Sequence, residues 1–180
     1  MNEYFPSLAD VVNSIASRQL PAVDQWHPAR CGHSDMRIAA DGTWFHRGAP
    51  IARPSMVKLF STILRRENDH YYLVTPVEKL EIIVDDAPFI AVEVASEGTG
   101  ELRSVAFRLN TDDYVIAGPD NRIRIDHAAD GTPRPYVHVR AGLEALIVRS
   151  VFYELAELAL AEDDVAVGLW SNSMFFPLAA

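Results

Sequence analysis

The spacing of apolar residues predicts one helix near the start of the chain and another after residue 53. Ser7 is followed three residues later by Asp10, which resembles a capping box, and the apolar residues that follow lie on one helical stripe to about Arg18. Arg53-Pro54 opens the second helix, because proline fits a first helical turn, where its missing N–H needs no partner. Both segments are therefore expected to be helical.

Elsewhere in the first 140 residues the apolar positions alternate with a period of two, which is typical of β-strands. Residues 36–38 and 44–46 flank Asp41-Gly42-Thr43, the kind of turn that joins the strands of a hairpin. Further strands are predicted over residues 80–84, 90–94, 102–109, 114–117, 123–126 and 136–140. The middle of the chain is therefore expected to be rich in sheet.

The last part of the chain is more apolar. Residues 143–160 place apolar side chains on most of a helical circumference, so we predict one long helix there, the most buried in the protein. Short strands over residues 165–170 and 174–178 are expected to close the chain.

An internal repeat predicts the domain organisation. Residues 37–43 and 124–132 share Arg-Ile, Ala-Ala and Asp-Gly-Thr in that order, and each copy continues to an aromatic-x-His strand and then to an arginine that we place at a helix start, Arg53 or Arg140. The pattern predicts an α+β fold in which a duplicated β-β-α-β unit forms two packed lobes. The expected parts of this one compact unit are 1–86, the N-terminal helix with the first lobe, and 87–180, the second lobe.

Composition and charge narrow the choice of partners. The 180-residue chain has 16 basic and 25 acidic residues, a formal net charge of −9, and 49% hydrophobic residues. This is the composition of a folded globular protein, and its acidic surface repels phosphate backbones and anionic lipid, so neither nucleic acid nor a membrane is an expected partner. The single cysteine, Cys31, and an N-terminus without a secretion signal favour a cytoplasmic protein.

The chain lacks the short motifs that mark common enzyme sites. It contains no G-x-S-x-G nucleophile elbow, no phosphate-binding P-loop and no Rossmann fingerprint. His27, Cys31, His33 and Asp35 are residue types that bind zinc, but no second Cys/His pair completes a standard site, which favours a polar surface loop. We therefore expect no catalytic residue, no metal and no cofactor.

Eight short motifs, spread over most of the chain after Gln25, together match one known family. They are Asp41–His46, Pro50–Arg53, Leu59–Ser61, Leu73–Lys79, Asp85–Phe89, Pro135–Arg140, Gly142–Arg149 and Trp170–Phe176. As a set they resemble the bacterial family called domain of unknown function 1285. The resemblance implies a duplicated α+β core, a C-terminal lobe superficially like a pleckstrin-homology fold, and a ligand site between the lobes with a role in signalling. It implies no reaction, cofactor or catalytic residue.

Alternation in the predicted strand 136–140 sends Val137 and Val139 toward the core, and Tyr136, His138 and Arg140 to the opposite face. A helix start favours an anion, so an arginine before each of two helices predicts a site for a small anionic ligand in a cleft between the lobes. The predicted ligand-binding residues are Trp44, His46, Arg53, Tyr136, His138, Arg140 and Glu144.

Other interpretations remain open at this stage. The arginines are structural braces if Arg140 pairs with Glu144 along a helix and Arg53 bonds carbonyls of the other lobe. The main hypothesis is a non-catalytic ligand-binding or signalling protein, whose partner is a small anion or another protein. The alternatives are an enzyme of unknown reaction, with His46 or His138 as general base and Glu78 or Glu144 as orienting acid, or a protein-interaction module. The oligomeric state is left open.

Overall fold

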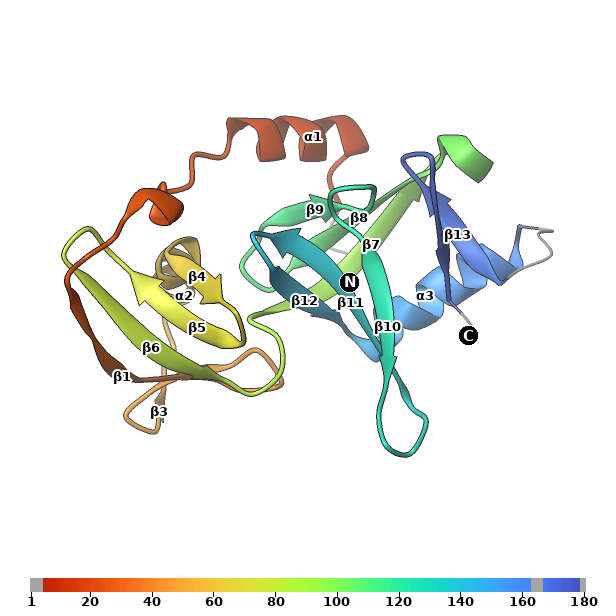
Figure 1. The fold of residues 1–180 in the computed structure, drawn as a ribbon. Helices are drawn as coiled ribbons and strands as arrows, with labels where there is room; N and C mark the ends of the chain where they lie inside the picture. The colour runs from red at the N-terminus through yellow and green to blue at the C-terminus, as the bar shows by residue number, and fades with distance from the viewer. Residues whose placement is uncertain (1–4, 163–166, 179–180) are drawn as a thin grey trace.

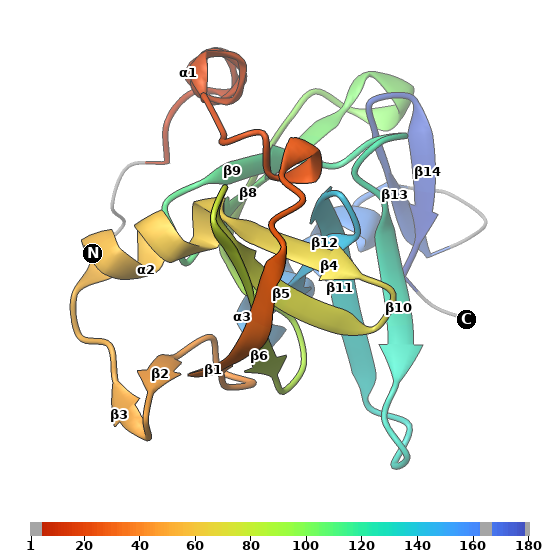
Figure 2. The same ribbon diagram turned by 60° about the vertical axis from the view of Figure 1, so that its left-hand side comes forward.

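Two curled six-stranded sheets organise the chain, one in each of two lobes (Figures 1 and 2). The structure is a computed structural model that describes residues 5–162 and 167–178. Helix α1 (Leu8–Ser17) and the 3-10 helix η1 (Val23–Gln25) precede the first lobe. The first lobe consists of β1 (Arg30–Ile38), β2 (Trp44–His46), β3 (Ala49–Pro50), α2 (Pro54–Thr62), β4 (Leu64–Glu67), β5 (His70–Val74) and β6 (Glu78–Val84).

The second lobe begins after a short linker at residues 85–88 and ends in a separate hairpin. Its elements are β7 (Phe89–Glu97), the 3-10 helix η2 (Gly100–Leu102), β8 (Ser104–Leu109), β9 (Tyr114–Ile116), β10 (Ile123–His127), β11 (Pro133–Arg140), β12 (Leu143–Ile147), α3 (Arg149–Leu160), β13 (Gly168–Ser171) and β14 (Met174–Pro177). Among the described helices, none combines the length and apolar character needed to cross a lipid bilayer.

The two sheets have the same topology, which confirms the predicted α+β duplication into two lobes. The repeated unit is a six-stranded sheet, however, and not the predicted β-β-α-β unit. Their strand orders are β3-β2-β1-β6-β5-β4 and β10-β11-β12-β7-β8-β9. Each sheet is thus two antiparallel three-stranded meanders, joined where the first strand lies parallel to the last, β1 to β6 and β7 to β12. In this arrangement β1 corresponds to β7, and β4 to β10.

The repeated Asp-Gly-Thr motif forms the same turn in both lobes. In each, the aspartate carboxylate accepts the threonine N–H at 2.9 Å, and the glycine has positive φ, 85° at Gly42 and 82° at Gly131. The turns join β1 to β2 and β10 to β11, however, so they do not occupy corresponding places in the two sheets. The motif recurs because it suits any hairpin of this geometry.

The predicted helix over residues 143–160 is wrong in its first third. Ala141 and Gly142 both have positive φ and make a tight two-residue turn, after which 143–147 form strand β12 with buried and half-buried positions alternating. A short apolar run fits a buried strand as well as a helix, and pairing with β7 and β11 selects the strand. Helix α3 does bury more residues than α1 or α2, but along one stripe, and its Leu160 is 71% exposed.

The other predicted elements are confirmed where the structure describes them. Ser7 caps α1, with its hydroxyl accepting the Asp10 N–H, and Pro54 stands in the first turn of α2. The strand predicted over residues 165–170 corresponds to β13, which begins at Gly168. Residues 165 and 166 lie outside the described residues.

One hydrophobic core runs through both lobes, with Trp44 and Leu64 from the first and Phe89 and Phe107 from the second. The turn between β1 and β2 packs directly on the second lobe. A Cβ added at Gly42 would lie 2.6 Å from Ile90 Cγ1, whereas a Cβ at Gly131 would meet nothing within 4 Å.

This difference gives a matched pair of variants. Gly131→Ala places alanine at positive φ without a clash, so we expect a loss of about 1–2 kcal/mol. Gly42→Ala suffers the same backbone cost and also pushes against the second lobe, which adds about 1–3 kcal/mol. Urea denaturation of the two variants measures the difference. Equal losses would show that the turn does not support the interface between the lobes.

Candidate functional site

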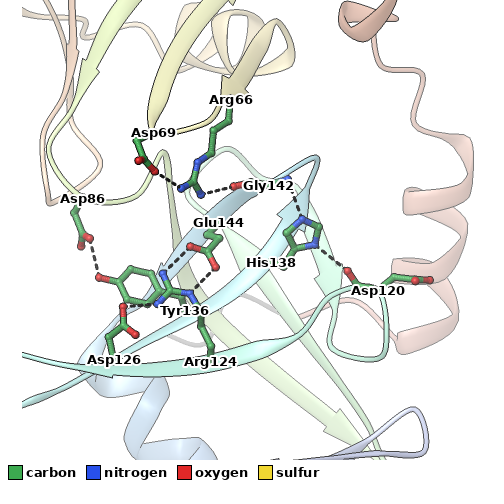
Figure 3. Close-up of polar contacts among 10 residues, drawn as sticks. All are labelled: Arg66, Asp69, Asp86, Asp120, Arg124, Asp126, Tyr136, His138, Gly142 and Glu144. Carbon is green, nitrogen blue, oxygen red and sulfur yellow. Dashed lines mark hydrogen bonds and ion pairs between the residues drawn. The ribbon is translucent and has the colours of Figure 1, made fainter.

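Strand β11 carries the residues that the sequence singled out, and its alternation is as predicted. Val137 and Val139 are buried in the core, while the side chains of Tyr136 and His138 engage polar partners on the other face (Figure 3). A bulge between His138 and Arg140 interrupts the pairing with β12. The strand thus places three functional groups in succession along the side that meets the first lobe.

Tyr136 belongs to a polar cluster between the second lobe and the linker. Its hydroxyl donates to Asp86 Oδ1 at 2.7 Å, and the Arg124 guanidinium lies 4.3 Å from its ring centroid. Arg124 in turn holds both oxygens of Glu144 at 2.7 Å (Figure 3). Burial, reinforced by the hydrogen bond to Asp86, raises the pKa of Tyr136 to about 12. Because its charged groups pair with one another, this cluster has a structural role.

His138 is held at both ring nitrogens. Nδ1 lies 2.8 Å from the carbonyl oxygen of Asp120, and Nε2 accepts the N–H of Gly142 at 3.1 Å (Figure 3). A carbonyl requires Nδ1 to donate, and an N–H requires Nε2 to accept, so these contacts select one neutral tautomer. The lone pair that a general base needs is therefore engaged in fixing the β11–β12 turn.

Arg140 does not precede a helix, which corrects one sequence prediction. It ends β11, and its Nη2 donates at 2.6 Å to the carbonyl of Ser61 in the last turn of α2. The predicted pairing with Glu144 is also absent, because Glu144 faces Arg124 instead. The terminal carbonyls of a helix attract a cation, so Arg140 links the second lobe to the C-terminus of a helix of the first.

Apart from this bond, the Arg140 guanidinium has few polar partners among the described residues. It lies 5.2 Å from the centroid of the Phe89 ring, and Nη1 is buried without a hydrogen-bond partner. No carboxylate of the described residues forms an ion pair with it. Burial, and next the positive charge of Arg18, lower the pKa of Arg140 to about 10. A part-buried cation with a buried, unpartnered donor is costly unless an anion accompanies it.

The remaining predicted residues do not converge on Arg140. Arg53 is exposed at the N-terminus of α2, the opposite end of that helix from Ser61. Trp44 is buried and stacks on Phe60 with ring centroids 6.2 Å apart. His46 is exposed on β2.

The pairs required by the enzyme hypothesis are not formed among the described residues. Glu78 lies 3.7 Å from Arg30, and Glu144 accepts from Arg124, so neither acid orients His46 or His138. The zinc motif is not assembled either: Cys31 is exposed, and residues 5–162 and 167–178 contain no cluster of three or more His, Cys, Asp or Glu suited to a metal.

A cavity of about 550 Å³ lies beside Arg140, between α1, α2 and the second sheet. Both lobes contribute to it, the first through Lys58 and the second through Arg140, while α1 contributes Arg18. Arg18 Nη2 lies 2.7 Å from Asp113 Oδ2, and Lys58 Nζ lies 4.0 Å from Asp112, so Arg140 is the lining cation that has no acidic partner among the described residues.

The sequence did not indicate that Arg18, Lys58 and Asp113 meet at this cavity. Arg18 and Asp113 are 95 residues apart, and no local motif links them. The sequence places both residues only at the ends of elements: Arg18 ends the predicted N-terminal helix, and Asp113 lies between two predicted strands.

The comparisons with known proteins agree with this architecture. The model of the N-terminal domain of a domain of unknown function, DUF1285, matches residues 21–87, and that of the C-terminal domain of the same family matches residues 88–178. The chain belongs to the DUF1285 family. Helix α1 precedes both matched segments. No curated protein matches the sequence.

Two solved structures of DUF1285 proteins are similar to the chain. The one from Silicibacter pomeroyi DSS-3 is 51% identical, with a TM-score of 0.82 and 93% of each chain covered. The one from Shewanella baltica OS155 is 24% identical, with a TM-score of 0.54, and the match covers 69% of this chain and 92% of that one. The second likeness concerns the fold alone.

The polar cluster predicts a pH-dependent contribution to stability. Tyr136→Phe removes a hydrogen bond to a carboxylate, so we expect a loss of about 1.5–3 kcal/mol at neutral pH. The pKa of Tyr136 is raised from 10.0 to about 12, so its contribution is complete below pH 10 and is lost as the pH rises through 12. Urea denaturation from pH 7 to 12 should show the variant and the wild type converging.

Tyr153→Phe is the control, because Tyr153 is exposed on α3. It should follow the wild type at every pH. A loss for Tyr136→Phe that stays constant up to pH 12 would contradict the assigned role of the hydroxyl.

Proposed function

We propose that this protein binds a small anionic ligand in the cavity between its lobes, as a non-catalytic cytoplasmic sensor or adaptor. The observation that carries the proposal is the part-buried Arg140 guanidinium, whose buried Nη1 has no hydrogen-bond partner and which forms no ion pair with a described carboxylate. An unmade hydrogen bond on a buried donor costs about 1–3 kcal/mol, and more when the group is charged. A bound anion would recover this cost.

The charge of the cavity supports an anion in particular. The protein as a whole is acidic, with a net charge of −9. The cavity walls differ, because Arg18, Lys58 and Arg140 outnumber Asp112 and Asp113. An anion is therefore drawn to this place rather than to the surrounding surface.

The position of the cavity supports a signalling role. Its walls come from both lobes and from α1, so a ligand there contacts three parts of the molecule at once. Binding energy that differs between two arrangements of these parts shifts the population between them. A change in lobe arrangement or in the position of α1 is then the signal that a partner protein would detect.

The brace interpretation of Arg140 makes the opposite prediction about stability. If the guanidinium serves only to bond Ser61 and cover Phe89, replacing it should lower the free energy of unfolding by about 1–3 kcal/mol. If the cation serves to bind a ligand, replacing it should leave the stability of the ligand-free protein almost unchanged, because the replacement removes a part-buried charge near Arg18.

Arg140→Gln tests the proposal. We expect the ligand-free variant to be as stable as the wild type or more stable, and to lose the rise in melting temperature that anions cause. The measurement is a thermal-shift series with acetate, octanoate, phosphate and AMP. Arg53→Gln, at the other end of α2, is the matched control and should respond like the wild type. An Arg140→Gln protein that keeps the response, or a wild type with none, would contradict the proposal.

A further inference from the structure

The cavity has an apolar wall as well as a cation. Ile15 of α1 and Leu20, three residues after that helix, line it and remain 40% and 37% exposed, while Val115 and Val139 line it from the second sheet. Exposed aliphatic side chains that face into a cavity gain free energy when a ligand covers them. The site therefore offers two kinds of contact, one for a charge and one for an apolar body.

The charges of the lining residues set the charge of the ligand. Three cations and two carboxylates leave an excess of one positive charge, and the carboxylates belong to Asp112 and Asp113. Asp113 is close enough to Arg140 for its charge to act on the guanidinium. A second negative charge on the ligand would therefore meet repulsion, whereas a single one completes the balance.

We propose that the ligand is an amphipathic monocarboxylate, with its carboxylate at Arg140 and its apolar chain against Ile15 and Leu20. This inference rests on the proposed function and names the ligand class for that site. A carboxylate is planar and accepts two hydrogen bonds, which matches guanidinium geometry. The cavity, at about 550 Å³, lies within the usual size of pockets for small organic ligands.

Helix α1 is then part of the ligand site rather than an appendage. It rests on the second lobe through few polar contacts, the Arg18–Asp113 ion pair and a hydrogen bond of 3.2 Å from the Leu8 N–H to Glu97 Oε1. Figures 1 and 2 show it above β9, joined to β1 by a connection that contains the 3-10 helix η1. Because Arg140 Nη1 is closed to water, a ligand reaches it when α1 or the arginine side chain shifts.

Calorimetric titration of the full chain with acetate, butanoate, hexanoate and octanoate tests the apolar contact. Each buried methylene should tighten binding about fourfold, so octanoate should bind far more tightly than acetate. Octyl phosphate, whose head carries more charge, should bind more weakly than octanoate. 1-Octanol, which lacks the charge, should not bind measurably.

Paired variants locate the apolar wall. Ile15→Ala should weaken octanoate binding about five- to tenfold and leave acetate binding unchanged. Val12→Ala is the control, because Val12 is 49% exposed on the same helix but does not line the cavity. Hydrogen exchange of residues 8–17 should slow when octanoate is bound and should not change with acetate.

The outcomes separate this inference from the proposed function. If acetate and octanoate bind with equal affinity and both require Arg140, the proposed anion site is supported and the inference of an amphipathic ligand is wrong. If octyl phosphate binds more tightly than octanoate, the single-charge argument is wrong. If octanoate binds equally well to Arg140→Gln, or no anion binds at all, the proposed function itself fails.

Discussion

Polar contacts between the two lobes converge on the two-residue turn between β11 and β12. Two guanidinium groups cross the interface there in opposite directions: Arg66 of the first lobe donates at 3.0 Å to the carbonyl of Gly142, and Arg140 of the second lobe donates to the carbonyl of Ser61. His138 holds the turn from within by accepting the Gly142 N–H. A backbone segment with positive φ at two successive residues is thus fixed from both lobes.

This arrangement explains why a cation is buried next to a cavity. The end of α2 presents carbonyl groups without intrahelical partners, and a guanidinium is well suited to them because its several donors are rigidly placed. One of these donors is used on Ser61 and another has no partner. Arg124 satisfies its donors with Glu144 and Asp126. Arg65 and Arg103 also leave buried nitrogens unpartnered, but each forms an ion pair, with Glu67 or Glu162. Arg140 differs from these arginines because none of the described carboxylates forms an ion pair with it, and this difference makes it the candidate binding group.

Local chemistry decided which features could be predicted from the sequence. The caps of α1 and α2 and the Asp-Gly-Thr hairpins depend on residues within a few positions of one another, and they were predicted correctly. The start of the predicted helix at residue 143 failed because its apolar run is compatible with both periods, and the deciding contact with β7 lies more than fifty residues away. That error also placed Arg140 before a helix, so the expected symmetry with Arg53 was wrong, although Arg140 and the inter-lobe position remain at the centre of the proposed site.

The duplication itself accounts for the cavity. In the first lobe, the connection between the two meanders contains α2, which follows β3 and precedes β4. In the second lobe, the corresponding connection between β9 and β10 is the helix-free segment 117–122, and Ile116 and Asn121 at its two ends line the cavity. Helix α1, which precedes both matched family segments, covers this side instead and packs against β9. A helix that belongs to neither sheet can move without breaking a strand pairing, so the duplicated fold leaves one side of the second lobe open to a ligand while both sheets stay intact.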